Sequence, residues 1–299
     1  MKRWLPLVLA LLLPALSGCA FSAGEPFSSG LSSEAAAPSE APRRVVSLYA
    51  SYTAAWLAAG GSLVGVTDDA VTERRLPVGD ARTVGTFTRP SLEQILALEP
   101  DLVLASADIA GQLALQEQFR ALGVRAVYDT VDTFEQYRDM MEQFLSWTGR
   151  SDLHTSLVDA PQAQVEAARA KRPPPGTSGP AVLLLRTNSA GVSAKADGTV
   201  ANEILRDLGA VNIARKNPAL LQDLSLEIIL REDPAYIFVV PQGISDAQAQ
   251  ELIDRLRAGD PAWAALSGQW IVLPKDLYHY KPNERWGESY AALAGILFP

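Results

Sequence analysis

The sequence predicts an α/β protein of two lobes that are joined by a long helix and enclose a ligand cleft. Three observations predict this class. Short apolar strands alternate with amphipathic helical stretches, which is typical of strand–helix–strand units around a central parallel sheet. The alternation restarts after residues 173–176, which read Pro-Pro-Pro-Gly. A ten-residue segment of the first half recurs in the second half.

Apolar runs of three to five residues predict the strands of both halves. In the first half they are 45–48, 64–67, 102–105 and 126–128, with helices expected over the residues before Gly60-Gly61 and over 113–122. The second half repeats this order. Its strands are expected at 181–185, 236–240 and 270–273, with a helix over 201–208 that Gly209 ends.

Residues 133–172 predict two helices between the lobes. Thr133 and Gln136 have the spacing of a capping box. The apolar face of the first helix consists of Phe134, Tyr137, Met141, Phe144 and Leu145, and Gly149 ends that helix. The second helix is expected over 152–171. Because an interior proline removes a backbone donor and kinks a helix, at a cost of about 3 kcal/mol, we expect a bend at Pro161.

The recurring segment is the strongest sign of an internal duplication. Residues 91–100, SLEQILALEP, align without gaps on residues 225–234, SLEIILREDP, and six of the ten residues are identical. In both copies the serine is expected to cap a helix, the leucines and the isoleucine to face inward, and Glu93 or Glu227 to face outward. A proline and an apolar strand follow each copy. We therefore expect two similar Rossmann-like α/β lobes with central parallel sheets.

The N-terminus has the features of an exported lipoprotein. Residues 1–18 combine a basic start with an apolar run, 4–16, that is too short to span a bilayer, and this predicts a signal peptide. Cys19 is the only cysteine, and the preceding Leu-Ser-Gly resembles a bacterial lipobox. We therefore predict lipidation at Cys19 and a membrane-anchored protein on the extracytoplasmic face of the cell membrane.

The composition of residues 20–42 predicts a flexible linker after the lipidated cysteine. Of these 23 residues, 20 are Ser, Ala, Glu, Pro or Gly, so the segment cannot bury enough apolar surface to order itself. The predicted organisation is a signal peptide at 1–18, Cys19 and its linker at 19–42, an N-terminal lobe at 43–150, an interdomain helix at 151–172 and a C-terminal lobe at 173–299.

Charge and residue counts exclude several functions. Lys plus Arg total 26 and Asp plus Glu total 34, a net charge of −8, so no basic excess is available to bind nucleic acid. One cysteine and two histidines, His154 and His279, exclude a thiolate cluster and a three-histidine zinc site. The sequence lacks Gly-x-Ser-x-Gly, a phosphate-binding loop and His-Glu-x-x-His. We predict a protein that is not an enzyme and that needs no cofactor.

In their order behind the lipobox, several short segments resemble class III substrate-binding proteins of ABC importers, which carry ferric siderophores, haem and cobalamin. These segments are 44–48, 63–67, 84–85, 91–104, 260–263 and 270–273. The resemblance implies a stiff interdomain helix and a small closure on the ligand. It also implies an ABC permease dimer with a cytoplasmic ATPase as partner, which Glu93 and Glu227 would dock. We expect the protein to be a monomer.

Ten residues are candidates for ligand binding. Ligands of open parallel sheets bind beyond the carboxyl ends of the strands, and aromatic and cationic side chains are dense in 278–286. These two observations favour Tyr49, Tyr52, Phe87, Arg89, Arg186, Tyr278, His279, Lys281, Arg285 and Trp286. Aromatic rings provide flat contact area, and Lys and Arg pair with anions. For Trp286, a place in the core is equally compatible with the sequence.

The candidates favour an anionic ferric siderophore as the ligand. Haem is the second choice and would need an axial ligand from Tyr278, His279 or Tyr280; otherwise no direct metal ligand is expected. Cobalamin is the third choice. A membrane-anchored sensor or haem relay that serves no permease is the alternative function. A carrier of a small anion or metal ion would leave the aromatic segment 278–286 unexplained.

Overall fold

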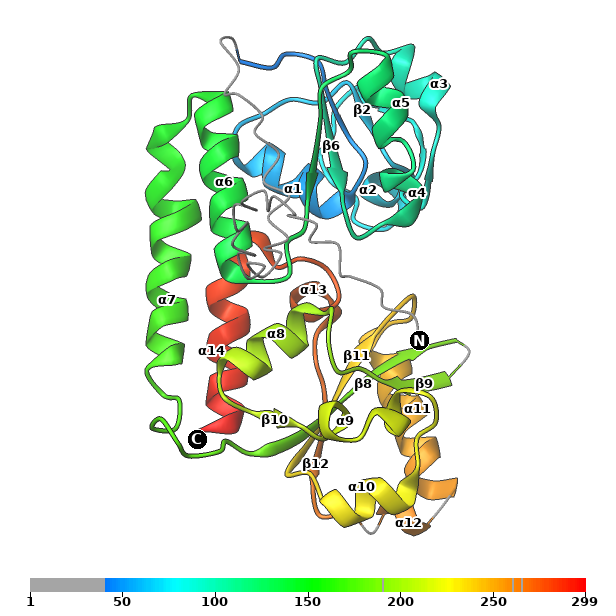
Figure 1. Ribbon diagram of the computed structural model, residues 1–299, viewed down its shortest axis with the longest axis vertical. Coiled ribbons are helices and arrows are strands. Elements are labelled where there is room, and N and C mark those ends of the chain that lie inside the picture. The colour runs from blue at the N-terminus through cyan, green and yellow to red at the C-terminus, as the bar shows by residue number, and fades with distance from the viewer. Residues whose placement is uncertain (1–40, 190, 260, 265) are drawn as a thin grey trace, which may run out of the picture. The chain divides into compact units, whose positions relative to one another are not determined.

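Two mainly parallel sheets with flanking helices form the protein (Figure 1). A computed structural model describes residues 41–189, 191–259, 261–264 and 266–299. The expected signal peptide, Cys19 and all but the last two residues of the linker lie outside this range. Within the described residues, no helix is both long enough and apolar enough to cross a membrane.

The N-terminal lobe is built on a sheet with the strand order β3-β2-β1-β6-β7, and every pairing in it is parallel. Its strands are β1 (Val45–Ser47), β2 (Gly65–Val66), β3 (Arg82–Thr83), β6 (Leu102–Ser106) and β7 (Ala126–Asp129). An antiparallel pair, β4 (Gly85–Thr86) and β5 (Arg89–Pro90), lies beside it. Its helices are α1 (Ala50–Ala58), α2 (Asp68–Thr72), α3 (Leu92–Leu96), α4 (Ala110–Leu113) and α5 (Gln116–Ala121). The four expected strands are confirmed, whereas the helix expected over 113–122 is divided into α4 and α5.

The C-terminal lobe repeats this arrangement with the order β10-β8-β11-β12, and β9 is added antiparallel to β8. Its strands are β8 (Ala181–Asn188), β9 (Gly191–Ala194), β10 (Val211–Asn212), β11 (Tyr236–Pro241) and β12 (Gln269–Val272). Its helices are α8 (Val200–Asp207), α9 (Ile213–Lys216), a 3₁₀ turn (Pro218–Leu221), α10 (Leu226–Glu232), α11 (Asp246–Gly259), α12 (Pro261–Ala264) and α13 (Lys275–Tyr278). The two-lobed α/β fold that the sequence predicts is therefore confirmed.

The two copies of the repeated segment have the same local structure. The serine side chain caps α3 and α10, accepting a hydrogen bond from a backbone N–H three residues on. Both helices are followed by a non-glycine residue with positive φ, Glu99 at 45° and Asp233 at 38°. A proline and a central strand follow in each copy. One expectation is corrected: Leu230 does not face inward but is 39% exposed, and the isoleucine is the fully buried member of each copy.

Three helices lie at one side of the sheets: α6 (Phe134–Thr148), α7 (Ala160–Arg169) and α14 (Trp286–Leu297) (Figure 1). The helical segment that leads into α7 passes beside α6, and α7 itself packs on α14. The expected capping box of α6 is present, and Gly149 ends this helix with a φ of 69°. Gly287 of α14 allows close packing on α7, because a Cβ atom there would meet the side chain of Gln164 at 2.0 Å. These helices share one hydrophobic core with both sheets.

The chain between α6 and α7 accommodates Pro161 through a change of helix type. A 3₁₀ turn (Ser151–Leu153) and a π-helical turn (Thr155–Asp159) precede α7, and Pro161 occupies its first turn. Proline is tolerated at this point of a helix because a first-turn N–H has no partner within the helix. The structure thus has a π-helical turn just before Pro161, and the bend that the sequence predicts there stays a prediction.

Candidate functional site

Four of the ten candidates come together in what we call the Arg186 cluster: Tyr49, Phe87, Arg186 and His279. Tyr49 follows β1, Phe87 lies in the turn between β4 and β5, Arg186 is part of β8, and His279 follows α13. The rings of Tyr49 and Phe87 have their centroids 6.4 Å apart. The cluster joins the ends of strands from both lobes, which is where ligands of parallel sheets bind.

The polar atoms of the cluster are buried and incompletely satisfied. The Nε atom of Arg186 and the Nδ1 atom of His279 are both buried, and neither has a hydrogen-bond partner. Among the residues that the structure describes, no carboxylate forms an ion pair with Arg186. A buried donor without a partner costs about 1–3 kcal/mol, so a bound group that accepts a hydrogen bond from Arg186 would recover this energy.

The charges in the cluster influence one another. Burial lowers the pKa of Arg186, and the nearby Tyr49 opposes this shift. Burial, and then the positive charge of Arg186, lower the pKa of His279 to about 4. Burial also raises the pKa of the Tyr49 hydroxyl. At neutral pH the cluster therefore presents one guanidinium cation, a neutral imidazole and a neutral phenol, which together suit an anionic partner with aromatic or flat surface.

Gln112 on α4 holds part of this cluster in place and was not a candidate from the sequence. Its buried side-chain amide donates to the carbonyl oxygens of Leu48 at 2.6 Å and Phe87 at 2.8 Å, and its Oε1 accepts from the N–H of Ser106 at 2.7 Å. One side chain thus joins the ends of β1 and β6 to the turn that carries Phe87. Only the three-dimensional contacts show this role, because a lone glutamine has no sequence signature.

Three candidates lie in the core. Tyr52 is 1% exposed and its hydroxyl donates to the carbonyl of Asp129 at 2.8 Å. Tyr278 is 1% exposed and donates to the carbonyl of Ser289 at 2.9 Å. Trp286, which starts α14, is completely buried. The apolar area of these three rings is thus used by the shared core, which for Trp286 is one of the two places compatible with the sequence.

The remaining cationic candidates differ in how they are paired. Lys281 is 9% exposed, and its Nζ lies 2.5 Å from Asp132 Oδ1 and 4.0 Å from Asp108 Oδ2, so its charge is already balanced. Arg285 makes a double hydrogen bond to Glu288, both at 2.7 Å, on the exposed side of α14. Arg89 is exposed and no acidic side chain pairs with it in the described part of the chain. Lys281 is thus placed as an ion-pair residue and not as a free cation.

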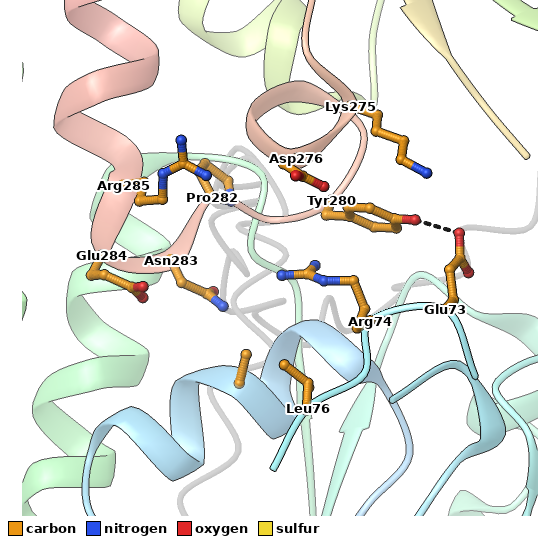
Figure 2. A pocket seen from close by; sticks show the side chains of 11 residues that line it. Glu73, Arg74, Leu76, Lys275, Asp276, Tyr280, Pro282, Asn283, Glu284 and Arg285 are labelled. Carbon is orange, nitrogen blue, oxygen red and sulfur yellow. Dashed lines mark hydrogen bonds between the residues drawn. The ribbon is translucent and has the colours of Figure 1, made fainter. Parts of the chain in front are cut away.

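Residues 279–285, which we call the bridging loop, connect the C-terminal lobe to the N-terminal lobe. The Tyr280 hydroxyl donates to Glu73 after α2, and the Lys281 ammonium contacts Asp132 before α6. The Nδ2 atom of Asn283 donates to the carbonyl of Ser51 in α1 at 3.0 Å. Figure 2 shows the pocket of about 500 Å³ that this loop forms with α1 and with Glu73 and Arg74. Glu73 and Arg74 carry no sequence pattern that predicts this position.

Glu93 and Glu227 are both exposed, each in the first turn of its helix. Their positions on α3 and α10 are equivalent in the two lobes. The orientation that the sequence predicts for these side chains is therefore observed. Among the described residues, no group of three or more His, Cys, Asp or Glu side chains is arranged to hold a metal ion.

Known proteins share this architecture. The vitamin B12-binding protein of Vibrio parahaemolyticus is 24% identical over 242 residues, which cover 79% of this chain and 85% of that protein. The Fe(3+) dicitrate-binding periplasmic protein FecB of Escherichia coli is 27% identical over 237 residues, 76% of this chain and 73% of that protein. The periplasmic haem-binding protein HutB of Vibrio cholerae superimposes with a TM-score of 0.64 at 24% identity and covers 86% of this chain and 99% of its own.

These relatives are named as binding proteins, not enzymes, and their named ligands are vitamin B12, ferric dicitrate and haem. The HutB superposition shows a common fold. The profile of the periplasmic binding protein family matches residues 45–277, which span both sheets. This chain therefore belongs to the periplasmic binding protein family, as its resemblance to class III substrate-binding proteins implied.

Proposed function

We propose that this protein is the lipid-anchored, extracytoplasmic substrate-binding component of an ABC importer, and that it captures an anionic ferric chelate. The observation that supports the ligand class best is the Arg186 cluster. It contains a half-buried guanidinium with an unsatisfied Nε and no acidic partner among the described residues, beside the rings of Tyr49, Phe87 and His279. The protein binds and releases this ligand and has no enzymatic role.

The charge of Arg186 favours a ferric chelate over cobalamin. A ferric complex of catecholate or hydroxycarboxylate groups carries negative oxygens, and these form charge-assisted hydrogen bonds with a guanidinium that are stronger than neutral ones. Cobalamin offers mainly flat area, for which a buried cation is a cost and not a gain. The ferric dicitrate-binding relative from Escherichia coli supports the first class.

Haem would need a free axial ligand near the cluster. The Tyr278 hydroxyl is used in a core hydrogen bond, and Tyr280 is bonded to Glu73. His279 is the remaining candidate, and its neutral imidazole is the form that binds iron. Haem binding would therefore depend on His279, whereas binding of an anionic chelate would depend on Arg186.

The ligand test is a titration of the purified mature protein with ferric citrate, a ferric tris-catecholate, haemin and cyanocobalamin, followed by tryptophan fluorescence and by isothermal calorimetry. We expect saturable binding of a ferric chelate, weakened at least about tenfold in Arg186→Gln because a hydrogen bond to a charged group contributes about 1.5–3 kcal/mol. Arg120→Gln, which changes an exposed arginine of α5, is the matched control. Saturation by haemin or cyanocobalamin alone would contradict the proposed ligand class.

The transport test uses the matched pair of exposed glutamates. Glu93→Ala combined with Glu227→Ala should abolish uptake of the iron complex by whole cells and leave its affinity for the purified protein unchanged. Glu117→Ala combined with Glu251→Ala removes one exposed helical glutamate from each lobe and should leave uptake intact. Normal uptake by the first double variant would contradict docking through these two residues and would favour a sensor or relay function.

The membrane anchor is tested separately from ligand binding. Replacing Cys19 by Ser removes the only thiol that can accept lipid. We expect the variant to leave the membrane fraction and the wild type to incorporate radiolabelled palmitate. Membrane association that is unchanged in Cys19→Ser would contradict lipid anchoring and would leave the ligand proposal untouched.

A further inference from the structure

The pocket beneath the bridging loop adjoins the Arg186 cluster, since the ring of its lining residue Tyr280 lies 5.0 Å from that of His279, but the two share no lining residue. It is lined by Ala54 of α1, the segment after α2 and seven of the residues between 275 and 285, and it has a volume of about 500 Å³ (Figure 2). Tyr49, Phe87, Arg186 and His279 do not line it. Since one water molecule occupies about 30 Å³ in the liquid, a molecule the size of an amino acid fits with several waters.

Two buried polar atoms of opposite kind lack partners in this pocket. The Nη1 atom of Arg74 is a donor without an acceptor, and the Oδ1 atom of Asn283 is an acceptor without a donor. Asn283 is 3% exposed, and its Nδ2 is already bonded to Ser51. Figure 2 shows the side chains of Arg74 and Asn283 pointing toward one another from the two lobes. A ligand between them would need both an acceptor and a donor.

The Asn283 side chain is held in this orientation by an unusual backbone. Its φ is +52°, a region that Asn and Asp tolerate better than other non-glycine residues. Arg74 is held from the other side, because its guanidinium lies 4.4 Å from the centre of the Tyr280 ring. The Tyr280 hydroxyl in turn is bonded to Glu73. Both unsatisfied atoms are therefore fixed by contacts that use the rest of their side chains.

The charges of the lining exclude a ligand of one sign. Arg285 is paired with Glu288, whereas Glu73 accepts from the neutral Tyr280 hydroxyl and keeps its negative charge. Lys275 also lines the pocket and has no ion-pair partner among the described residues. The carboxylates of Asp276 and Glu284 line the same pocket and have no ion-pair partner in the described part of the chain. A polyanion such as a ferric chelate would meet these carboxylates, and a simple cation would leave the Arg74 donor unsatisfied.

We propose that this pocket binds a small zwitterion of the amino-acid class. Its carboxylate accepts a hydrogen bond from Arg74 Nη1, and its ammonium group donates to Asn283 Oδ1 and is attracted by Asp276 and Glu284. Because both lobes supply lining residues, an occupied pocket holds the lobes in the arrangement described above. The inference does not depend on which iron complex the Arg186 cluster binds.

The test is isothermal calorimetry of the mature protein with two zwitterionic probes and two single-charge probes. L-Alanine and 4-aminobutyrate carry both charges at different separations, and butyrate and butylamine each keep one charge on the skeleton of 4-aminobutyrate. We expect saturable binding of at least one zwitterion and none of butyrate or butylamine. Arg74→Gln should weaken this binding about tenfold or more, and Glu284→Gln should weaken it less.

Controls separate the pocket from the fold and from the ferric site. Arg82→Gln changes an exposed arginine on β3 and should bind the zwitterion like the wild type. All variants should keep the wild-type unfolding midpoint and affinity for the ferric chelate. The inference is overturned if neither zwitterion binds, if a single-charge probe binds as tightly, if Arg74→Gln and Glu284→Gln both bind normally, or if ferric citrate displaces the zwitterion competitively.

Discussion

A substitution at Lys281 distinguishes two roles of this residue. The sequence favours it as a ligand contact, whereas the structure shows it in an ion pair between the lobes. Its side chain is 10% exposed and that of Asp132 is 21% exposed, with the Nζ–Oδ1 distance at 2.5 Å. Lys281→Met keeps most of the apolar length of the side chain and removes the charge. We expect the variant to be clearly less stable than the wild type, because the half-buried Asp132 carboxylate then loses its partner.

The magnitude follows from the burial of the pair. Breaking a buried ion pair by removing one partner costs about 3–5 kcal/mol, and the partial exposure of Asp132 favours the lower end of this range, about 3 kcal/mol. For a protein of this size, about 1 kcal/mol shifts the melting temperature by roughly 2–4 °C. The expected decrease in melting temperature is therefore roughly 6–12 °C.

The assay combines scanning calorimetry with ligand titration of the same samples. Lys281→Met should keep its affinity for the ferric chelate within about threefold, because Lys281 is not part of the Arg186 cluster. Arg186→Gln should show the reverse pattern, with weak binding and a nearly unchanged melting temperature. The double variant Lys281→Met with Asp132→Asn should recover part of the lost stability, because the uncompensated carboxylate is gone.

One result would refute this reasoning. If Lys281→Met melts within about 2 °C of the wild type, as expected for an exposed pair, and loses affinity as strongly as Arg186→Gln, then Lys281 acts on the ligand. The sequence-based prediction that Lys281 binds the ligand would then hold, and the ion pair with Asp132 would not be needed for stability.

Three further predictions concern single side chains. Tyr278→Phe removes the hydrogen bond to Ser289 and should cost about 1 kcal/mol in urea unfolding without changing ligand affinity; weakened binding would return Tyr278 to the site. Trp286→Ala empties a fully buried position and should cost about 3–5 kcal/mol; a loss below about 1 kcal/mol would contradict its place in the core. His279 has a pKa of about 4 in the folded protein against an ordinary value of 6.5, so the unfolded chain binds the proton more readily, and the stability that is fully present above pH 6.5 declines as the pH falls toward 4. His279→Gln should flatten this decline in melting temperatures measured at pH 7 and pH 4.5, and an unchanged slope would assign the decline to other groups.

The fold could be predicted because its signals are local. Apolar strands, the capping box at Thr133 and the glycine at position 149 act within a few residues, and each is found where the sequence indicates it. The duplicated Ser-Leu-Glu segment also predicted that the two lobes have similar α/β structures. The strands β3, β4, β5, β9 and β10 were not predicted, because, unlike the equally short β1, β2 and β7, they contain no run of apolar residues and their pairing depends on the neighbouring strand.

The candidate site was harder to predict because its contacts are distant in sequence. Lys281 and Asp132 are separated by 149 residues, and no local pattern relates them. Tyr278 and His279 are adjacent, yet the first lies in the shared core and the second in the Arg186 cluster. Aromatic density therefore indicated a segment of which His279 belongs to the Arg186 cluster, and only the packing of α13 and α14 determines which of its rings lie outside the core.

The π-helical turn at Thr155–Asp159 accommodates one more residue than an α-helical turn, because it closes i→i+5 hydrogen bonds and not i→i+4 bonds. Deleting one residue from this turn should therefore restore regular α-helix and leave every following side chain of α7 on its present face. In an α-helix each residue advances the side chains by about 100°, so a deletion inside α7 before Val165 would instead turn Val165 and Ala168, which are now buried, away from the shared core. A single codon lost from the π-helical turn should thus be tolerated far better than one lost a few residues later.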